Sequence, residues 1–514
     1  MKYALGSGQM KAIDRYTIET VGIPSMVLME KAAMAVVRHT KELCSEKDTI
    51  LAVCGYGNNG GDGIAAARIL FMEGYHVAIH MVGEREHATK ETKQQLKIAK
   101  KIGVPVLRKV HFEEYTIIVD AIFGIGLART VAGEFRRIIE SINNYTAKVV
   151  AVDIPSGVCA DDGKVLGVAV KADITVTFGF QKVGCLLFPG SEYAGRVFVE
   201  DIGFATGGLA EAPTRFYFDD EPKVLLPVRH QNSNKGTYGK VLVIAGSKNM
   251  SGAAYFAATA AYRMGSSLVR ILTAQENREI LQRQIPEAIL TTYETSEDGI
   301  SETDAQNIRE AVEWASVIVL GPGLGQSLMS ARIVNYVICE CKVPLVIDAD
   351  GLNIISHMIS EKVPAEEGIE GRIRYLAELL PAETILTPHK KELSVLTGIP
   401  LADLVGCLID SSASCTYNND LIYVKKDVRT IVSFGSSDYI NVSGNDGMAT
   451  AGSGDVLAGM IAGLLAQGEL PKMAAMAGCF LHGLAGNTAA KKKGPRSMLA
   501  SDILEAIPDI LQEA

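Results

Sequence analysis

Two glycine-rich loops lie far apart in the chain, and each stands between a hydrophobic run and a helix-like stretch. The first is GYGNNGGDG at Gly55–Gly63, and the second is NDGMATAGSGDVLAG at Asn445–Gly459. Because small side chains at the start of a helix expose backbone N–H groups and the positive end of the helix dipole, such loops attract phosphate or another anion. The first loop is rich in amide and carboxylate groups, whereas the second ends in an anion cradle followed by Asp455, a candidate base. We therefore predict two different active sites, both of which handle nucleotides.

The length of the chain and its pattern of hydrophobic runs predict two domains. With 514 residues the chain exceeds the roughly 250–300 residues at which single cores usually split. A βαβ pattern begins at Thr49, the segment EAPTRFYFDDEP at 211–222 interrupts it, and a new α/β series begins at Lys240. We place the domains at 1–215 and 222–514 and predict two doubly wound, three-layer α/β/α folds.

Charge, hydropathy and cysteine usage exclude several classes of protein. The net charge of −9 offers no general basic surface for a polyanion, so we do not expect nucleic acid as a partner. No segment reaches about 18 uninterrupted apolar residues, and the start lacks the apolar core of a signal peptide; we expect a soluble, cytoplasmic protein that binds no membrane. The nine cysteines lack the spacing of a zinc site, so we expect reduced thiols. We also expect a homo-oligomer.

Polar residues follow three strand-like runs in the first half. The first glycine loop follows ILAVC, Asp120 ends YTIIVD, and Asp153 ends KVVAVD. Because the carboxyl ends of parallel strands form one crevice, these residues should converge. Asp62, inside the loop, would repel a pyrophosphate unless a cation intervened. Asn59, Asp120 and Ser156 would supply the hard oxygen ligands of such a cation, which leaves Asp153 free for acid–base chemistry.

A structural role for these residues is the alternative interpretation. Asn58, Asn59 and Asp62 would then cap the helix, and the strand-end aspartates would cap turns. Capping does not require NNGGDG, DAIFGIGL and DIPSG together, so we favour a ligand site. GYGNNG also satisfies the GxGxxG pattern of dinucleotide folds, but Glu84 fits only approximately the acid expected at the end of the next strand.

From about Gln9 to Thr206 the sequence resembles the NAD(P)H-hydrate epimerase family. The motifs LMEKAA, GYGNNGGDG, VDAIFGIGL and VDIPSG occur in the order and spacing of that family. The resemblance implies that Asn59, Asp120 and Ser156 hold potassium and that Asp153 contacts the reactive end of the hydrated cofactor. It also implies a substrate site made of Asn58, Asn59, Gly60, Gly61, Asp62, Gly124, Ile125, Gly126, Leu127, Ala128, Arg129, Thr130 and Asp153.

The second glycine loop predicts phosphoryl transfer. ATAGSGD opens a helix whose N–H groups can close on a phosphoryl group as charge develops, and Asp455 is placed to accept a proton from a hydroxyl nucleophile. The alternative is a capped helix without chemistry, but GPGLG, DADGLN, TPHKKE and Lys426 at other strand ends favour a site. The position of His389 at a strand end favours a ligand contact over a purely structural role. Asp348 and Asp350 are two residues apart in DADGLN and are not predicted to bind one metal ion.

From about Tyr238 to Leu511 the sequence resembles the ribokinase-like ADP/ATP-dependent NAD(P)H-hydrate dehydratase family. The resemblance rests on KGTYGKVLVIAGS, GPGLG, DADGLN, TPHKKE and GMATAGSGDVLAG, and it implies a ribokinase-like second domain after a Rossmann-like first one. Substrate contacts are then expected at Ala254, Gly323, His389 and Asp455, and nucleotide contacts at Lys426, Asp427, Val428, Arg429, Thr430 and Gly454. Two positions depart from the family pattern: Asn234 replaces a histidine, and Asp427 replaces a glycine and puts a carboxylate near phosphates.

The order of the two halves is similar to that of the fused bacterial NAD(P)H-hydrate repair enzymes. This similarity implies that the first half interconverts the R and S forms of NADHX and NADPHX, the hydrated nicotinamide cofactors. The second half would dehydrate the S form with ADP or ATP and Mg²⁺, releasing AMP or ADP together with phosphate. The alternatives are a kinase for a small alcohol, such as a vitamin precursor or a sugar, and an N-terminal module that senses nucleotides or binds proteins.

Overall fold

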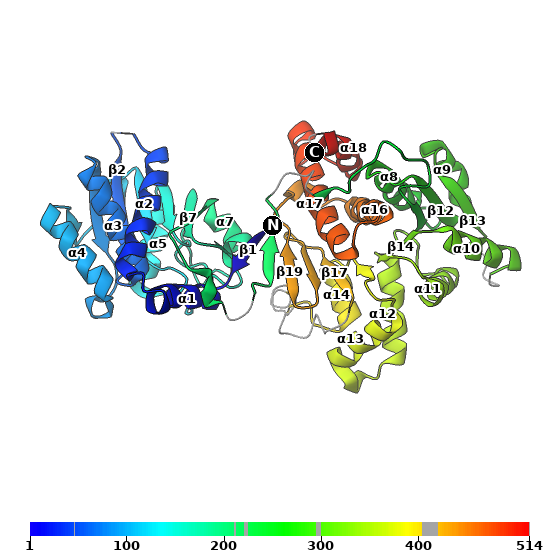
Figure 1. Cartoon of the computed structure of the whole chain (residues 1–514), viewed down its shortest axis with the longest axis horizontal. Helices are drawn as coiled ribbons and strands as arrows, with labels where there is room; N and C mark the ends of the chain where they lie inside the picture. The colour runs from blue at the N-terminus through cyan, green and yellow to red at the C-terminus, as the bar shows by residue number, and fades with distance from the viewer. Residues whose placement is uncertain are drawn as a thin grey trace. The chain divides into compact units, whose positions relative to one another are not determined.

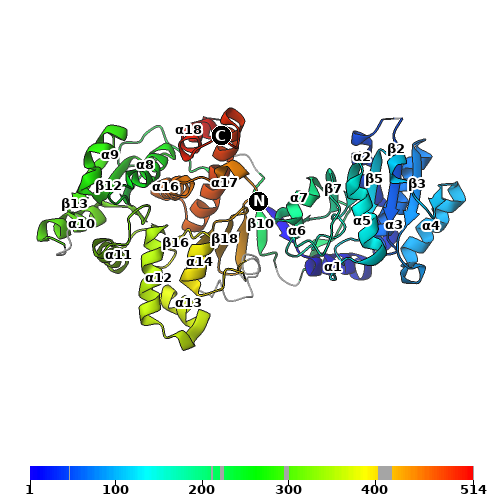
Figure 2. The same cartoon turned by 180° about the vertical axis from the view of Figure 1, so that it is seen from behind.

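The chain folds as two compact units (Figures 1 and 2). The computed structural model describes residues 1–45, 47–209, 212–219, 225–294, 300–402, 404 and 420–512. One unit, called the N-terminal unit below, is Tyr3–Arg215; the C-terminal unit is Phe216–Ala514 together with Met1–Lys2. Among the described residues, no helix combines the length and the apolar character needed to cross a bilayer.

The N-terminal unit is built on a parallel sheet in the order β4-β3-β2-β5-β6-β7-β9. Its strands are β2 (Thr49–Cys54), β3 (His76–Met81), β4 (Val106–Leu107), β5 (Ile117–Ala121), β6 (Lys148–Val152), β7 (Ile174–Phe178) and β9 (Arg196–Glu200). Two short strands, β1 (Lys2–Leu5) and β8 (Gln181–Lys182), pair in parallel. The helices are α1 (Ser7–Arg15), α2 (Ser25–Leu43), α3 (Asn58–Met72), α4 (Lys90–Ile102), α5 (Gly133–Asn144), α6 (Val183–Leu186) and α7 (Gly190–Ala194).

Both faces of this sheet are covered by helices. Along β2, Ile50 and Ala52 point into a core that includes residues of α2, α3 and α4, whereas Leu51 and Val53 point into a second core that includes residues of α5. Successive strand residues face opposite sides, and burial on both sides explains why the run TILAVC is almost entirely apolar.

The C-terminal unit has a larger sheet, in the order β13-β12-β11-β14-β15-β16-β17-β18-β19-β10. Its strands are β10 (Arg215–Tyr217), β11 (Lys240–Ile244), β12 (Leu268–Ala274), β13 (Ile289–Tyr293), β14 (Val317–Leu320), β15 (Leu345–Ile347), β16 (Ile385–Leu386), β17 (Ile422–Lys425), β18 (Ile431–Phe434) and β19 (Ser437–Ile440). The strands from β13 to β17 are parallel, and β17, β18 and β19 pair antiparallel.

Helices cover both faces of the second sheet as well. They are α8 (Ser251–Arg263), α9 (Arg278–Gln284), α10 (Glu302–Trp314), α11 (Leu328–Glu340), α12 (Asp350–Lys362), α13 (Gly368–Leu379), α14 (Lys390–Thr397), α16 (Ser453–Ala466), α17 (Pro471–Lys493) and α18 (Ala500–Gln512). Val241 and Val243 join a core with α8, α16 and α17, and Leu242 and Ile244 join a core with α10, α11 and α12.

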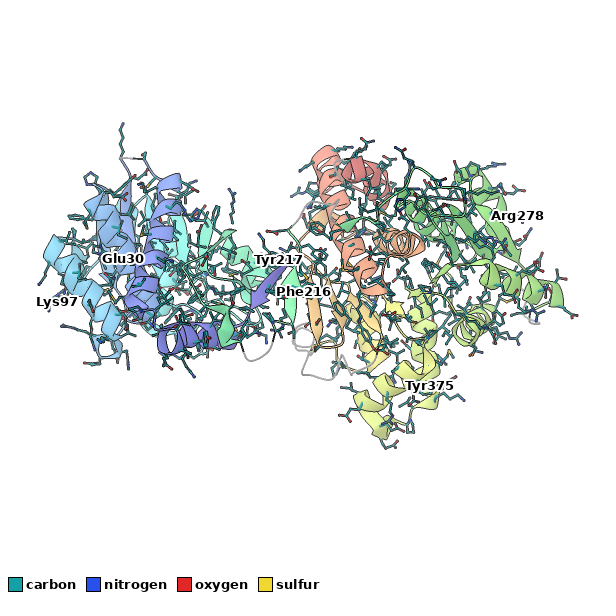
Figure 3. The ribbon with its side chains drawn as sticks, viewed as in Figure 1. Glu30, Lys97, Phe216, Tyr217, Arg278 and Tyr375 are labelled. Atoms are coloured by element: carbon teal, nitrogen blue, oxygen red, sulfur yellow. The ribbon has the colours of Figure 1, made fainter. Side chains whose placement is uncertain are left out.

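The segment between the two α/β patterns contributes to the core of the C-terminal unit. The ring centroid of Phe216, which is labelled in Figure 3, lies 6.0 Å from that of Tyr439, and the ring centroid of Phe218 lies 4.7 Å from that of Tyr439. Both phenylalanines belong to the core that contains α16 and α17. The prediction of two doubly wound α/β/α folds is confirmed.

Candidate active sites

A cavity of about 730 Å³ opens at the carboxyl ends of β2, β5 and β6 in the N-terminal unit. The order of the strands reverses between β2 and β5, and open α/β sheets bind ligands at this point. Gly60 and Gly61 are buried, and Thr130 is exposed and does not line the cavity. The predicted substrate residues that line it are Asn58, Asn59, Asp62, Gly124, Ile125, Gly126, Leu127, Ala128, Arg129 and Asp153.

The first glycine loop leads from β2 into α3 with almost no space for side chains. A Cβ atom on Gly60 would lie 1.8 Å from the carbonyl oxygen of Gly55, so a larger residue would push the loop apart. A Cβ atom on Gly63 would lie 2.3 Å from the Cβ atom of Ala121 on β5. The glycines therefore let α3 begin directly at the edge of the sheet, which places the N-terminus of the helix at the cavity.

Asp120 and Ser156, two of the predicted cation ligands, are in direct contact beneath the cavity. The Ser156 amide and hydroxyl donate hydrogen bonds of 2.8 and 2.6 Å to the Asp120 carboxylate. Burial raises the pKa of Asp120 to about 6, although hydrogen bonds from Ser156 and Ile122 lower it. The third predicted ligand, Asn59, packs near Gly124, and its buried Nδ2 has no hydrogen-bond partner in the part of the chain that the structure describes.

Asp153 is held at the cavity by a buried lysine. It follows β6 with a φ of 66°, a left-handed conformation that is unusual outside glycine. Its Oδ1 atom lies 2.7 Å from Nζ of Lys182, a residue with no exposed surface, and accepts hydrogen bonds from the Thr177 hydroxyl and the Phe178 amide. Nζ of Lys182 also donates to the Phe178 carbonyl at 2.8 Å. Lys182 thus compensates the charge of Asp153 and fixes its orientation.

Two further carboxyl groups face the same cavity. Burial, together with the charges of Asp153 and Asp14, raises the pKa of Asp62 well above its ordinary value. Burial and the charge of Asp153 also raise the pKa of Asp14, which lies on α1. Carboxyl groups therefore outnumber basic groups around this cavity, whose lining holds Asp14, Asp62, Glu84, Glu91 and Asp153 against Lys11, Arg129 and Lys182. Such a site takes an anionic ligand only when protons or a cation reduce its negative charge.

Lys182 and Asp14 were not among the residues predicted for this site. Both lie on elements outside the βαβ pattern, Lys182 on β8 and Asp14 on α1. The lysine interrupts the largely apolar run FGFQKVGCLLF, and a lysine buried in such a run needs a charged partner, so a signal for Lys182 was present. Asp14 lies in a polar helical segment that gives no comparable signal.

In the C-terminal unit, the candidate base Asp455 lies in the first turn of α16 beside an ion pair whose carboxylate is buried and whose lysine is partly exposed. Nζ of Lys426 is 2.6 Å from Oδ1 of Asp348. Burial and the charge of Asp348 raise the pKa of Asp455 to about 7, although Lys426 lowers it. Burial opposes the charge of Lys426, but Asp348, Glu392 and Asp455 raise its pKa above the ordinary value. Asp455 can therefore exchange a proton near neutral pH, as a general base must.

Small residues bring the start of α16 onto this ion pair. Gly452, with a φ of 91°, precedes the helix in a conformation that favours glycine. A Cβ atom on Gly454 would lie 3.1 Å from Nζ of Lys426 and 3.5 Å from Oδ2 of Asp348. The structure thus brings Gly454, Lys426 and Asp455 together, and Asp348 is a fourth member that we had not assigned to the site.

The remaining residues of the predicted nucleotide site lie between β17 and β18. Asp427, which departs from the family pattern, pairs with Lys390 at 2.7 Å. Arg429 donates a hydrogen bond of 3.0 Å to the carbonyl of Val442. An ion pair with Lys390 therefore offsets the negative charge that Asp427 adds. The connection consists of Lys426, Asp427, Val428, Arg429 and Thr430.

The predicted substrate contacts of this half form two groups. His389 follows β16, caps α14 by accepting a hydrogen bond from the Glu392 amide, and is bridged to Lys426 through the backbone. Its side chain is 52% exposed, so it remains accessible to a ligand. Gly323 packs on α8, where its Cβ atom would lie 2.8 Å from that of Ala253, next to the fully buried Ala254.

Comparison with known families assigns each half. Residues 25–184 match the family described as the YjeF-related protein N-terminus, and residues 241–509 match the NAD(P)H-hydrate dehydratase family. A relative from Thermofilum pendens, named bifunctional NAD(P)H-hydrate repair enzyme Nnr, is 34% identical over 98% of this chain and 95% of its own length. The chain belongs to the bifunctional NAD(P)H-hydrate repair enzyme family.

Other relatives of this repair-enzyme chain resemble one half each. An NAD(P)H-hydrate epimerase from Oenococcus oeni is 46% identical over 39% of this chain and 96% of its own length. A crystal structure of an ADP/ATP-dependent NAD(P)H-hydrate dehydratase from Bacillus subtilis, co-crystallised with ATP and Mg²⁺, is 25% identical. It covers 57% of this chain and 95% of its own, with a TM-score of 0.45. The full-length relatives fit the predicted family and do not fit a small-alcohol kinase with a sensing module.

Proposed function

We propose that this repair-family chain epimerises the R and S hydrates of NADH and NADPH in the N-terminal unit. The C-terminal unit then dehydrates the S hydrate with ADP or ATP as the phosphoryl donor. The observation that carries the proposal is the presence of two separate polar sites, each at the carboxyl ends of its own sheet, in a full-length relative of named repair enzymes.

At the N-terminal site, Asp153 is the group proposed to move a proton at the nicotinamide ring. Its ion pair with Lys182 fixes the carboxylate, and the loops at 58–62 and 124–130 would bind the rest of the cofactor. Potassium fits beneath this site because Asp120 is buried and no cationic side chain of the described residues contributes to its pKa. Asn59, Asp120 and Ser156 would hold the ion, whose charge would offset the carboxylates facing the cofactor.

At the C-terminal site, Asp455 is proposed to accept the proton of the C6 hydroxyl group as its oxygen attacks the terminal phosphoryl group of the nucleotide. Lys426 and the N–H groups at the start of α16 would stabilise the charge that develops on that phosphoryl group. Phosphate is a much better leaving group than hydroxide. Its departure with the C–O bonding electrons, followed by loss of a ring proton, would restore the double bond.

The test is to supply purified hydrates with each nucleotide and to follow the absorbance of the restored dihydropyridine. The S hydrate should give NADH with ADP or ATP and release one phosphate for each NADH. The R hydrate should give NADH only through prior epimerisation, so it requires both sites. Absence of NADH formation from either hydrate would contradict the proposal, and a stable phosphorylated product would assign the second site to a kinase.

We further propose a cytoplasmic homo-oligomer that acts on small molecules and not on nucleic acid. Every cysteine among the described residues is free, which suits a reducing compartment. The net charge of −9 disfavours polyanion binding. Light scattering after size-exclusion chromatography measures the oligomeric state, and a mass of one chain would contradict that part of the proposal.

A further inference from the structure

A second cavity, which we call the lysine pocket, lies on the N-terminal unit. Its volume is about 490 Å³, and five of its nine lining residues are basic: Arg85, Lys93, Lys97, Lys100 and Lys101. None of the nine, all within the described chain, is acidic. Such a concentration of positive charge is notable on a chain whose net charge is −9. The pocket therefore suits a ligand of concentrated negative charge.

The four lysines of the pocket come from one helix. α4 has the sequence KETKQQLKIAKKI, and the spacings of three, four and eight residues put Lys93, Lys97, Lys100 and Lys101 on neighbouring turns of one face. Lys97 is labelled on this helix in Figure 3. Like charges at these spacings repel one another and destabilise a helix. A bound anion would remove that repulsion.

The pocket adjoins the candidate epimerase site. Tyr56, in the first glycine loop, lines both cavities. The Thr92 hydroxyl of α4 donates a hydrogen bond of 2.7 Å to the Gly57 carbonyl, and the Thr89 amide donates one of 3.1 Å to the Tyr56 carbonyl. Helix α4 is thus fastened to the loop that begins α3. A ligand with its reactive end near Asp153 can extend past Tyr56 toward the lysines.

The position of the pocket indicates which end of a dinucleotide it would receive. In dinucleotide folds, the residue after the second strand meets the adenosine ribose: an acid suits a free 2′-hydroxyl group, and an arginine suits a 2′-phosphate. Here the corresponding strand is β3, which pairs with β2. The chain after β3 carries both kinds of residue, Glu84 lining the first cavity and Arg85 lining the lysine pocket.

We propose that the lysine pocket binds the 2′-phosphate of NADPHX and makes the N-terminal site prefer NADPHX to NADHX. The inference rests on the proposed epimerase function and names the feature of the substrate that the site selects. A phosphate monoester carries about −1.5 to −2 charges at pH 7, so several lysines can contact it at once. NADHX has a neutral hydroxyl group at this position and gains nothing from the pocket.

The kinetic test neutralises three lysines together in the variant Lys93→Gln/Lys97→Gln/Lys100→Gln. The measured quantity is the ratio of kcat/KM for epimerisation of NADPHX to that of NADHX. The ratio should fall about tenfold, because three exposed charge contacts of about a factor of two each are lost. Lys90→Gln, on the same helix but outside the pocket, should leave the ratio at its wild-type value. An unchanged ratio in the triple variant would overturn the proposal.

A binding test works even if the chain turns over no hydrate. Calorimetry compares 2′-phospho-ADP-ribose with ADP-ribose, two molecules that differ only in the 2′-phosphate. The first should bind about tenfold more tightly, and the difference should disappear in the triple variant and weaken as salt is raised. The triple variant could instead weaken the binding of ADP-ribose and of free ADP by as much as it weakens the binding of 2′-phospho-ADP-ribose. In that case the lysines bind 5′-phosphates, and the assignment to the 2′-phosphate is wrong. Failure of hydrate turnover alone would contradict only the proposed function.

Discussion

The two candidate sites contain the same types of side chain, aspartate and lysine, but pair them differently. Each contains several aspartates and a lysine paired with one of them, with a lysine–carboxylate distance of 2.7 Å in the N-terminal unit and 2.6 Å in the C-terminal unit. In the N-terminal unit, Lys182 pairs with Asp153, the residue proposed to move the proton. In the C-terminal unit, Lys426 pairs with Asp348 and leaves Asp455 with a pKa raised to about 7.

This difference shows how one set of groups can support two chemistries. An aspartate that is paired directly keeps a fixed position and a compensated charge, as a group that shuttles a proton between two faces of a ring requires. An aspartate that lies largely out of solvent beside an ion pair made by other groups has a pKa raised above its ordinary value, as a base for a hydroxyl group requires. The choice of partner for the lysine therefore separates the two sites.

The largest expected effect is that of Asp455→Asn on dehydration. Loss of a positioned base lowers the rate by about 10²- to 10⁴-fold, and epimerisation should remain at the wild-type rate because it uses the other unit. Nucleotide-dependent NADH formation from the S hydrate measures the first activity, and chromatography of the R and S hydrates measures the second. Dehydration close to the wild-type rate in this variant would show that Asp455 is not the base.

The next prediction concerns Lys182→Met, which leaves Asp153, whose side chain is 13% exposed at the cavity, without its partner. Breaking a buried pair from one side costs about 3 kcal/mol, or roughly 100-fold in the folding equilibrium. Denaturant unfolding measures this loss, and adding Asp153→Asn should restore part of it. Lys164→Met, which removes an exposed pair with Asp162, is the control and should cost less than about 1 kcal/mol. If both variants lose the same free energy of unfolding, burial of the Lys182 ion pair does not increase its contribution to stability.

Potassium should matter to one site only. Exchange of potassium for a bulky organic cation should slow epimerisation about tenfold or more, since an uncompensated buried charge at Asp120 would remain, while activity returns when potassium is added back. Asp120→Ala should lose this response. The control is dehydration of pure S hydrate, measured in the same exchanged buffer. Epimerisation that ignores both the exchange and the substitution would remove the cation from the mechanism.

The pH dependence of the two activities should differ. Because the pKa of Asp455 is raised to about 7, dehydration should fall about tenfold per pH unit below that value and level off above it. The folded chain binds this proton more tightly than the unfolded chain, so the contribution of Asp455 to stability is lost as pH rises through about 7. Asp455→Asn should therefore raise the unfolding temperature at pH 8. A lower unfolding temperature at that pH would contradict the assigned direction of the pKa shift.

The smallest effect is expected from separating the units. Fragments 1–213 and 214–514 keep Phe216 and Phe218 with the core that they pack into. Each fragment exceeds the size of a typical independent domain, so each should fold and retain its own activity within about twofold. Circular dichroism and the two separate assays check this. An unfolded fragment would show that the two units depend on each other.

Most of the correct predictions from the sequence rest on recurring apolar runs, which identify strands. Runs such as TILAVC and KVVAVD identify buried parallel strands, and the rule that strand ends converge brought Asp153 to the glycine loop correctly. The apolar run around Lys182 indicated that this lysine needs a charged partner, but the sequence did not indicate that the partner is Asp153, because the position of Lys182 depends on the pairing of β8 with β1. Asp348 was recognised as part of a motif, but its partner Lys426 lies 78 positions away, and only the fold shows that they meet.

The left-handed backbone at Asp153 has a consequence for anyone who evolves this protein in the laboratory. A non-glycine residue in that conformation costs on the order of 1 kcal/mol, a cost that glycine would not bear. Selection for heat resistance alone would therefore favour Asp153→Gly combined with an apolar residue at position 182. The selected variants would be more stable but would lack epimerase activity. A screen for tougher variants must assay turnover at every round, because at this position durability and catalysis select opposite residues.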